Sequence, residues 1–403
     1  MSATLLAVGC GPEQVAGIRA ARKLGYRVVG VDGNPQAVGA AACDLFVPVD
    51  IADEAAVIEE ARLHSPVAVI PTPIGRFLTT VGAVNDALCL RGVSRETALL
   101  CTDKERFHAA LVSAGYPRPW RQAFTQWSEL DRVEAVRHLP VILKPRHGSG
   151  SRGVRTARTA EELARHVAEL SETAGFDAWL CEGLVEGTEF GVDGWVRDGE
   201  AHVVAIRQKT LTPEPMRQVV GYSAGVNPPA ETRAAVTEAM RQVVRAVRQS
   251  CGLFQADIIV RDDGSIHVIE FAARPPGLVM AEEMVPRLTG VDVLSAGIEL
   301  VARGAAPPST QVLRHVELRF LRFRAGTIRA VAVPPPTPPN ALVRTGVAAG
   351  MTLHAITSGA DVLQRGWVMA WSEEGAPLTE SSARRVCERV DSIERSWLDV
   401  VQF

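Results

Sequence analysis

The segment from Phe254 to Arg274 reads FQADIIVRDDGSIHVIEFAAR. Apolar residues recur on both sides of the turn sequence Asp-Asp-Gly at 262–264. Asp-Gly between two such runs is a strong signal for a β-hairpin. We therefore predict strands over 255–260 and 265–271, joined as a hairpin.

Two acidic residues lie on this predicted hairpin, Asp257 within the first strand and Glu270 at the end of the second. Because the strands pair, the two carboxylates can lie side by side. Adjacent acids on an apolar hairpin are costly unless a cation neutralises them. Hard oxygen ligands suit Mg²⁺, which typically also takes phosphate oxygens. The alternative interpretation is two solvated acids at strand ends.

A glycine-rich loop lies upstream of the hairpin. A strand predicted over 141–144 ends in Lys144, and residues 147–153 read HGSGSRG. Glycines let backbone N–H groups approach a phosphate closely, and small hydroxyls add donors. Lys144 is placed to neutralise an α- or β-phosphate. The loop does not match the Walker P-loop pattern, and an ordinary hairpin turn is the alternative.

A third segment, 182–189, reads EGLVEGTE. A strand end followed by a glycine-broken link and a further acid can hold an adenosine. Surface loops often have this composition, so the segment carries little weight by itself.

The N-terminal region has the pattern of a βαβ unit. An apolar run over 4–8 precedes Gly-Cys-Gly, a helical pattern follows over 13–24, and further strands are expected over 27–31 and 67–71. Strand, helix and strand at this spacing indicate a parallel sheet.

The same region raises a nicotinamide dehydrogenase as an alternative. Gly9 and Gly11 follow the first strand, and Asp32 lies about twenty residues on. The third glycine of the dinucleotide-binding pattern would fall at position 14, which is Gln14. Without that glycine, close packing of helix and strand at a pyrophosphate is compromised. Titration with NAD and with ATP distinguishes a dehydrogenase from a protein that binds ATP.

Composition limits the class of protein. The chain has 403 residues, which suggests two to three domains. Its 47% hydrophobic and 22% charged residues are typical of a soluble globular protein. The formal net charge of −3 gives no global field that attracts nucleic acid or anionic lipid. We expect neither nucleic acid nor membrane as a partner.

Cysteine usage and the N-terminus favour a cytoplasmic protein. The seven cysteines are scattered and include no Cys-x-x-Cys pair, as expected for reduced thiols. The N-terminus lacks a basic n-region, and no apolar run approaches the ~18 residues of a membrane helix. His108, His166 and His315 are isolated in the sequence, and we interpret them as ordinary surface or core residues.

The order of these features is more specific than any one of them. Between 103 and 277 the chain carries Asp-Lys, a strand ending in lysine, a Gly/Ser loop, Glu-x-x-x-x-Gly-x-Glu, a strand aspartate and Glu-x-x-x-Arg. This order resembles the ATP-grasp superfamily, which grips ATP between two α+β subdomains. The resemblance covers essentially the whole chain and implies a combined α/β and α+β fold. The implied domains are a Rossmann-like preATP domain at 1–103, an ATP-grasp domain at 104–305 with subdomains at about 104–185 and 186–305, and an α+β domain at 306–403 like that of L-amino-acid ligases.

The resemblance also implies roles for single residues at matching motif positions. Lys104 and Lys144 match nucleotide-binding lysines, and Lys144 is expected to assist catalysis. Asp257 and Glu270 match magnesium ligands, and Arg274 matches the arginine that steadies the substrate carboxylate and its acyl-phosphate. The other expected nucleotide contacts are the loop residues His147, Gly148, Ser149, Gly150, Ser151 and Gly153, the adenine-reading hinge residues Glu182, Gly183, Leu184 and Val185, and the ribose-binding acid Glu189.

One position departs from the family pattern. The family usually reads Glu-x-Asn-x-Arg, with the asparagine as a metal ligand, whereas this chain has Ala272. Water, a backbone carbonyl or another acid would have to replace the asparagine at a second magnesium ion, or activity would be reduced. Lys209 and Arg217 are candidate contacts for an anionic substrate group, with solvated loop charges as the alternative.

The resemblance therefore implies a ligase that depends on ATP and Mg²⁺ and serves biosynthesis. It would activate a small-molecule carboxylate as an acyl-phosphate and join it to an amine, forming an amide or peptide bond with amino-acid-like substrates and releasing ADP and phosphate. A homodimer is expected from the resemblance alone. The alternatives are an ATP-grasp carboxylase or purine-pathway-type enzyme, and a non-catalytic nucleotide-binding protein, which Ala272 supports.

Overall fold

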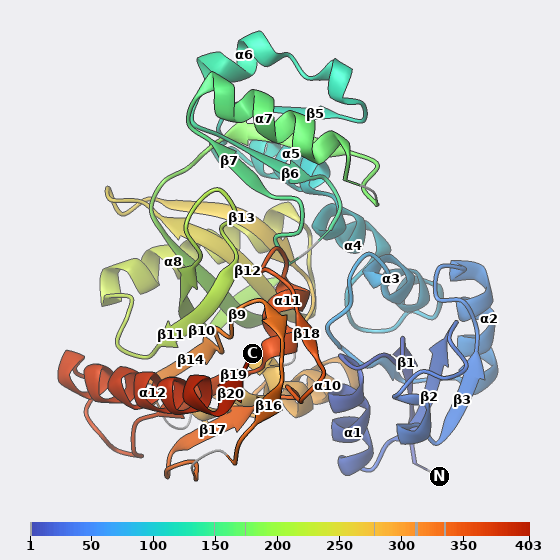
Figure 1. Cartoon of the computed structure of the whole chain (residues 1–403). Helices are drawn as coiled ribbons and strands as arrows, with labels where there is room; N and C mark the ends of the chain where they lie inside the picture. The colour runs from blue at the N-terminus through green and yellow to red at the C-terminus, as the bar shows by residue number, and fades with distance from the viewer. Residues whose placement is uncertain (1, 149, 174, 278, 311–312, 334–335) are drawn as a thin grey trace.

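The computed structural model describes residues 2–403 except 149, 174, 278, 311, 312, 334 and 335. Figure 1 shows an N-terminal α/β region in blue, a smaller lobe in cyan to green at the top, and a large sheet whose elements run from green to red. The fold is the predicted combination of α/β and α+β, with parallel pairing in the N-terminal sheet and antiparallel pairing in the other sheets.

The N-terminal region is built on a parallel sheet. Its elements are β1 (Thr4–Val8), α1 (Val15–Lys23), β2 (Arg27–Asp32), η1 (Ala40–Ala42), β3 (Leu45–Pro48), α2 (Glu54–His64), β4 (Ala68–Val69), α3 (Leu78–Ala87) and α4 (Arg95–Thr102). The strand order is β3-β2-β1-β4, and the neighbours are parallel. This confirms the predicted βαβ unit. Almost every residue of β1 and β2 is buried, as expected for strands covered on both faces.

The small lobe holds an antiparallel sheet in the order β5-β8-β6-β7, whose two inner strands are β6 and β8. Its elements are α5 (Lys104–Ser113), β5 (Arg121–Phe124), η2 (Trp127–Glu129), α6 (Arg132–Arg137), β6 (Val141–Pro145), β7 (Arg155–Ala157), α7 (Ala160–Ser171) and β8 (Trp179–Gly183). Helix α7 buries Leu163, Val167 and Leu170, which recur at helical spacing, in an apolar cluster confined to this lobe. The lobe therefore has a core of its own.

The large sheet has eight strands in the order β13-β12-β9-β10-β11-β14-β19-β17. The elements up to residue 303 are β9 (Thr188–Arg197), β10 (Glu200–Leu211), β11 (Val219–Ala224), α8 (Ala230–Ala246), β12 (Gly252–Val260), β13 (Ile266–Ala272), η3 (Val279–Met284), α9 (Val285–Thr289) and α10 (Val293–Arg303). Strands β12 and β13 pair antiparallel and confirm the predicted hairpin. The hairpin forms one edge of the sheet.

The C-terminal residues complete this sheet at its other end. Their elements are β14 (Val316–Phe320), β15 (Gly326–Thr327), β16 (Ala330–Val331), β17 (Ala341–Arg344), β18 (Thr352–Leu353), α11 (Gly359–Arg365), β19 (Trp367–Trp371), α12 (Glu380–Val400) and β20 (Val401–Gln402). Strand β14 pairs antiparallel with β11, so the sheet continues across the predicted 305/306 boundary. The division of the chain into domains at 103/104 and 305/306 stays a prediction.

The apolar face of the β12–β13 hairpin is fixed in the main core. The rings of Phe254 and Phe271 stack with centroids 5.2 Å apart, and both side chains are buried. Their cluster extends to Leu6 and Val29 of the N-terminal sheet. Burying side chains of this size contributes about 1.5–3 kcal/mol each. This packing holds one face of the hairpin against the core and leaves the opposite face to polar residues.

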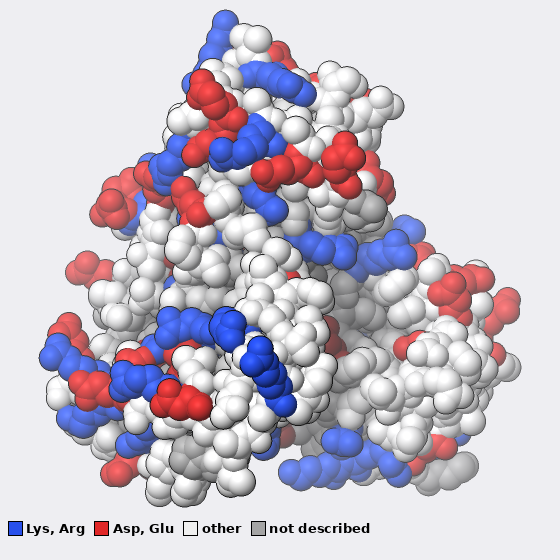
Figure 2. Space-filling view, viewed as in Figure 1, with Lys and Arg blue, Asp and Glu red and all other residues white. Residues whose placement is uncertain are grey.

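The surface is of mixed charge. Figure 2 shows Lys and Arg interspersed with Asp and Glu on the face in view, including along α12 at the lower left. In the part of the chain that the structure describes, no helix is both long enough and apolar enough to cross a membrane.

Candidate active site

The two predicted metal ligands lie opposite each other on the hairpin. Asp257 of β12 is the direct cross-strand partner of Glu270 on β13. Their side chains are partly exposed, on the face opposite the buried phenylalanines. The Nζ atom of Lys209 lies 2.7 Å from Asp257 Oδ2, and the Nζ atom of Lys104 lies 3.9 Å from Glu270 Oε2. Both acids therefore face cationic groups from other elements.

Lys104 joins the hairpin to the glycine-rich loop (147–153). Asp103 caps α5 by accepting hydrogen bonds from the backbone N–H groups of the next turn, which places Lys104 at the first helical position. The Lys104 ammonium donates to the carbonyl oxygen of Gly148 at 2.9 Å. Burial lowers the pKa of Lys104, while the nearby Glu270 acts in the opposite direction.

A bidentate ion pair fixes the base of the same loop. Arg146 donates to both carboxylate oxygens of Asp103 at 2.8 and 2.7 Å. The backbone N–H of Lys104 also donates to the carbonyl of Arg146. The start of α5 and the start of the glycine-rich loop are thus held together, and Lys104 at the start of α5 reaches the carboxylate of Glu270.

The glycine-rich loop has a backbone that requires glycine. Gly148, Gly150 and Gly153 have φ of +135°, +69° and +75°, a region that residues with a side chain rarely adopt. The carbonyl of Gly150 accepts a hydrogen bond from the N–H of Gly359 at the start of α11, so the loop also contacts the C-terminal part of the chain. Among the other predicted contacts, the His147 ring approaches the Thr102 carbonyl, Ser151 lies within the loop, and Ser149 falls outside the described residues.

Lys144 is buried and ion-paired with Glu182. They lie on the neighbouring strands β6 and β8, and the Lys144 ammonium donates to Glu182 Oε1. His108, interpreted from the sequence as an ordinary surface or core residue, is buried, and its Nε2 lies 3.2 Å from Glu182 Oε2. Burial opposes ionisation of Glu182, but Lys144 and His108 outweigh it and hold the pKa of Glu182 well below its usual range. Burial lowers the pKa of His108 to about 4.

The expected hinge segment (182–185) uses part of its backbone within the protein. The N–H of Gly183 donates to the Trp120 carbonyl, and the N–H of Leu184 donates to the Pro140 carbonyl. Those two N–H groups already have hydrogen-bond partners. An adenine held at this segment would therefore have to use other backbone groups, such as those of Val185. The role of the hinge in reading adenine stays a prediction.

The expected ribose-binding acid is also paired. Glu189 lies at the start of β9 and accepts a hydrogen bond from Arg217 at 2.5 Å, with Lys209 Nζ 3.9 Å away. Lys209 is only 6% exposed, so its interpretation as a solvated loop charge is wrong. Burial opposes the charge of Lys209, but Asp257, Tyr222 and Glu189 together outweigh it and raise the pKa of Lys209.

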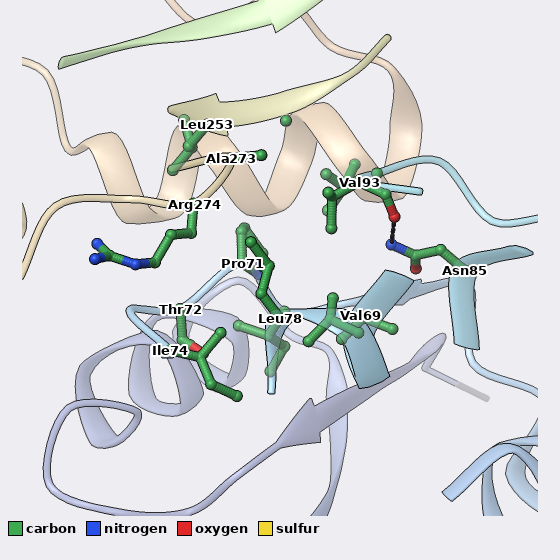
Figure 3. A pocket seen from close by; sticks show the side chains of 15 residues that line it. Val69, Pro71, Thr72, Ile74, Leu78, Asn85, Val93, Leu253, Ala273 and Arg274 are labelled. Carbon is green, nitrogen blue, oxygen red and sulfur yellow. Dashed lines mark hydrogen bonds between the residues drawn. The ribbon is translucent and has the colours of Figure 1, made fainter. Parts of the chain in front are cut away.

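Arg274 directly follows the hairpin. Its guanidinium donates to the side-chain oxygen of Gln255 at 3.2 Å and to the carbonyl of Pro275 at 2.7 Å. Figure 3 shows a small cavity where the hairpin meets the N-terminal sheet, lined by apolar side chains such as Val69 and Leu78. The Arg274 guanidinium points away from that apolar space.

One functional candidate, Gln255, was absent from the predicted site, and Lys209 was predicted only as a contact for an anionic substrate group, not as a neighbour of Asp257. Lys209 and Arg207 stand two apart on β10, a spacing that puts both on one face of a strand. That spacing was the available signal for Lys209. Gln255 lies two residues before Asp257 on β12, but a glutamine on a strand is too common to indicate a site.

The donor set fits magnesium held jointly with a nucleotide. Among the described residues there is no cluster of three or more His, Cys, Asp or Glu side chains that could hold a metal. Mg²⁺ in nucleotide sites is usually bound by one or two carboxylates, with phosphate and water oxygens completing its octahedron. The facing carboxylates of Asp257 and Glu270 satisfy that requirement, and Lys104 and Lys209 lie where phosphate charge would be neutralised.

The N-terminal glycines are arranged differently from a dinucleotide-binding loop. The Gln14 side chain lies over Gly9 and Gly11, with its Oε1 atom 3.5 and 3.1 Å from where their Cβ atoms would be. Asp32 accepts hydrogen bonds from the backbone N–H groups of Cys10 and Asn34, which close its own loop. The space and the acid that a dehydrogenase would use are therefore occupied by the chain itself.

Comparison with known proteins agrees with this geometry. A family model described as "ATP-grasp domain" matches residues 137–282. The chain is 37% identical over 120 residues, 28% of its length, to the uncharacterized protein y4rH of Sinorhizobium fredii. It is 24% identical over 350 residues, 79% of its length, to the carbamoyl phosphate synthase large chain of Deinococcus radiodurans. The chain covers 25% and 33% of the lengths of these two relatives.

A solved structure shares the fold over almost the whole chain. The crystal structure of L-amino acid ligase from Bacillus licheniformis superposes with a TM-score of 0.76 at 18% identity, covering 97% of this chain and 98% of that one. At this identity the likeness concerns the fold. Residues 137–282 thus match the ATP-grasp domain model, and the chain shares the fold of this ligase over almost its whole length.

Proposed function

We propose that the chain is an ATP- and Mg²⁺-dependent ligase that joins a small carboxylate to an amine. The observation that carries the proposal is the convergence at one point of Lys104, the glycine-rich loop and the Asp257–Glu270 pair. Bound there, Mg²⁺ would neutralise the phosphate charge that develops during phosphoryl transfer.

The residues of the site divide into a phosphate side and an acceptor side. Lys104 and Lys209 place two ammonium groups beside the carboxylates, where they would spread the charge of the transferring phosphoryl group. The glycine-rich loop would cover the phosphates and exclude water. Arg274 would hold the acceptor carboxylate, in a bidentate pair if both oxygens are reached.

The proposed reaction has two balanced steps. A carboxylate oxygen attacks the γ-phosphorus of ATP, the bond to the β–γ bridging oxygen breaks, and ADP leaves with that electron pair. The amine nitrogen then attacks the acyl carbon, inorganic phosphate leaves, and the nitrogen gives up a proton. The products are an amide, ADP and phosphate. Exclusion of water matters because hydrolysis of the acyl-phosphate would waste ATP.

Amino-acid-like substrates are part of the proposal, supported by the whole-chain likeness to the L-amino acid ligase fold. A screen of amino acids in pairs, with phosphate release and mass-spectrometric detection of ADP, tests it. ADP that appears only when a carboxylate and an amine are both present supports a ligase. ADP that instead requires bicarbonate supports the carboxylase alternative, and no ADP with any pair contradicts the proposal.

Ala272 is the one observation that favours a non-catalytic nucleotide-binding protein. Its methyl group stands where the family pattern has a metal-ligating amide. A protein that binds ATP with Mg²⁺ but releases no ADP across the screen would establish that second function.

A cytoplasmic location and a homodimer complete the proposal, and light scattering of the purified chain tests the homodimer.

A further inference from the structure

Four side chains form a square on the polar face of the β12–β13 hairpin. Asp257 is paired with Glu270, and two residues further along Gln255 is paired with Ala272. Residues two apart on a strand point to the same face. The square therefore has two carboxylates, one amide and one methyl group.

The chemistry of its neighbours permits one orientation for the Gln255 amide. Arg274 has only N–H donors, and its NH1 lies 3.2 Å from Gln255 Oε1. Ionised Asp257 has only acceptors, and its Oδ1 lies 3.5 Å from Gln255 Nε2. The oxygen must face the arginine and the amino group must face the carboxylate. Reversing the amide would set donor against donor and acceptor against acceptor.

This orientation turns the amide oxygen away from the two carboxylates. A metal held between Asp257 and Glu270 would meet the amino group of Gln255, which cannot act as a ligand. Gln255 therefore does not replace the family's asparagine as a metal ligand. The Gln255 side chain instead lies between the carboxylate of Asp257, the proposed metal ligand, and Arg274, which would hold the acceptor substrate.

We propose that Gln255 is a positioning residue, which ties the guanidinium of Arg274 to the carboxylate of Asp257. This inference rests on the proposed function of Arg274. In this role the Gln255 amide would set how far Arg274 holds an acceptor carboxylate from Asp257, and Ala272 opposite has a side chain small enough to leave room for the longer glutamine. Misplacing a reacting group by about 1 Å can cost on the order of 100-fold in rate.

Three variants separate positioning from metal ligation. Gln255→Met keeps the length of the side chain and removes both hydrogen bonds. Gln255→Glu keeps an acceptor for Arg274 but sets a second negative charge beside Asp257. Gln242→Met, at an exposed glutamine of α8, is the matched control. Circular dichroism and thermal melting establish that each variant is folded.

The first measurement needs no substrate. Phenylglyoxal modifies accessible arginines, and peptide mass spectrometry gives the rate at Arg274. Releasing the guanidinium from a hydrogen bond to a charged group is expected to raise that rate ~10-fold in Gln255→Met. In Gln255→Glu and Gln242→Met, the rate of modification at Arg274 should stay near that of the protein without a substitution. An unchanged rate in Gln255→Met overturns the proposal.

The second measurement is Mn²⁺ binding in the presence of ADP, followed by electron paramagnetic resonance. We expect the Mn²⁺ affinity of Gln255→Met to stay within about twofold of the unmodified protein. A loss of 10-fold or more, the scale on which metal-site residues act, would identify Gln255 as a metal ligand and overturn the proposal.

The kinetic readout separates this inference from the proposed function. With a substrate pair from the screen, Gln255→Met is expected to raise KM for the carboxylate or lower kcat, with KM for ATP unchanged. A rise in KM for ATP alone contradicts the proposal. If no pair releases ADP while Arg274 labelling still responds to Gln255→Met, the ligase assignment fails and the hydrogen-bonded link between Gln255 and Arg274 stands.

Discussion

The ammonium of Lys104 and the carboxylate of Glu270 lie 3.9 Å apart, although one begins helix α5 and the other nearly ends strand β13. The same ammonium donates to the Gly148 carbonyl. One cation thus touches the glycine-rich loop and the carboxylate pair at once. This contact links the small lobe to the large sheet at the place where we propose that phosphates bind.

Replacing Glu270 with alanine is expected to weaken binding of ATP with Mg²⁺ by at least about 10-fold, because one of two carboxylates is lost. Isothermal titration calorimetry measures the affinity. Asp262→Asn is the control, since it removes an exposed acid from the turn of the same hairpin. Equal affinities for Glu270→Ala and Asp262→Asn would contradict the metal assignment.

Lys144→Met is expected to lower the free energy of unfolding by about 3–5 kcal/mol, because it leaves the buried Glu182 without its lysine counter-ion. The double variant Lys144→Met, Glu182→Gln removes the uncompensated charge and should recover part of that loss. Urea unfolding of the two variants measures the difference. A double variant less stable than the single one would show that Glu182 is not stabilised through Lys144.

Gly187→Ala is expected to be more destabilising than Gly199→Ala. Both glycines have positive φ, but a Cβ on Gly187 would lie 2.4 Å from the Val260 carbonyl oxygen, whereas at Gly199 no atom lies within 4 Å. Strain alone costs about 1–2 kcal/mol, and the clash with β12 adds about 1–3 kcal/mol. Urea unfolding compares the two, and equal losses would contradict the close packing of Gly187 against β12.

His108 is expected to make stability fall with falling pH. Burial lowers its pKa to about 4 in the folded chain, below the usual ~6.5. Between those values the unfolded chain binds a proton that the folded chain does not, so unfolding becomes easier as pH drops. Between pH 7 and pH 5 the loss is about 2 kcal/mol.

Urea unfolding at pH 7 and at pH 5 measures this loss of stability. His108→Gln should show a smaller loss than the protein without the substitution. His267, whose pKa burial lowers to about 3, would retain a similar contribution. The exposed His354 supplies the control variant, His354→Gln, which should keep the full pH dependence. If His108→Gln keeps it as well, the folded chain does not exclude the proton from His108.

Much of the fold followed from local signals in the sequence. The Asp-Asp-Gly turn and the apolar runs beside it specify the β12–β13 hairpin, because turn type and alternation fix register. The N-terminal βαβ unit followed from its apolar runs in the same way. Local patterns do not say which distant strands pair, so the continuation of the sheet from β11 to β14 was not predicted.

The sequence predicted only those residues of the candidate site that belong to a local motif. Lys209 approaches Asp257 diagonally across β9, where Gly191, the cross-strand partner of both Asp257 and Arg207, has no side chain, and that proximity depends on strand order. His108 lies on helix α5, and its contact with Glu182 depends on how α5 packs beside β8. Such contacts arise from tertiary packing and leave no local signal.

A crystal structure with Mg²⁺ and a non-hydrolysable ATP analogue tests the central claim most directly. We predict a Mg²⁺ ion about 2.0–2.1 Å from oxygens of both Asp257 and Glu270, with the phosphates beside Lys104. An ion or nucleotide bound elsewhere, with the two carboxylates still paired to Lys209 and Lys104, would contradict the account.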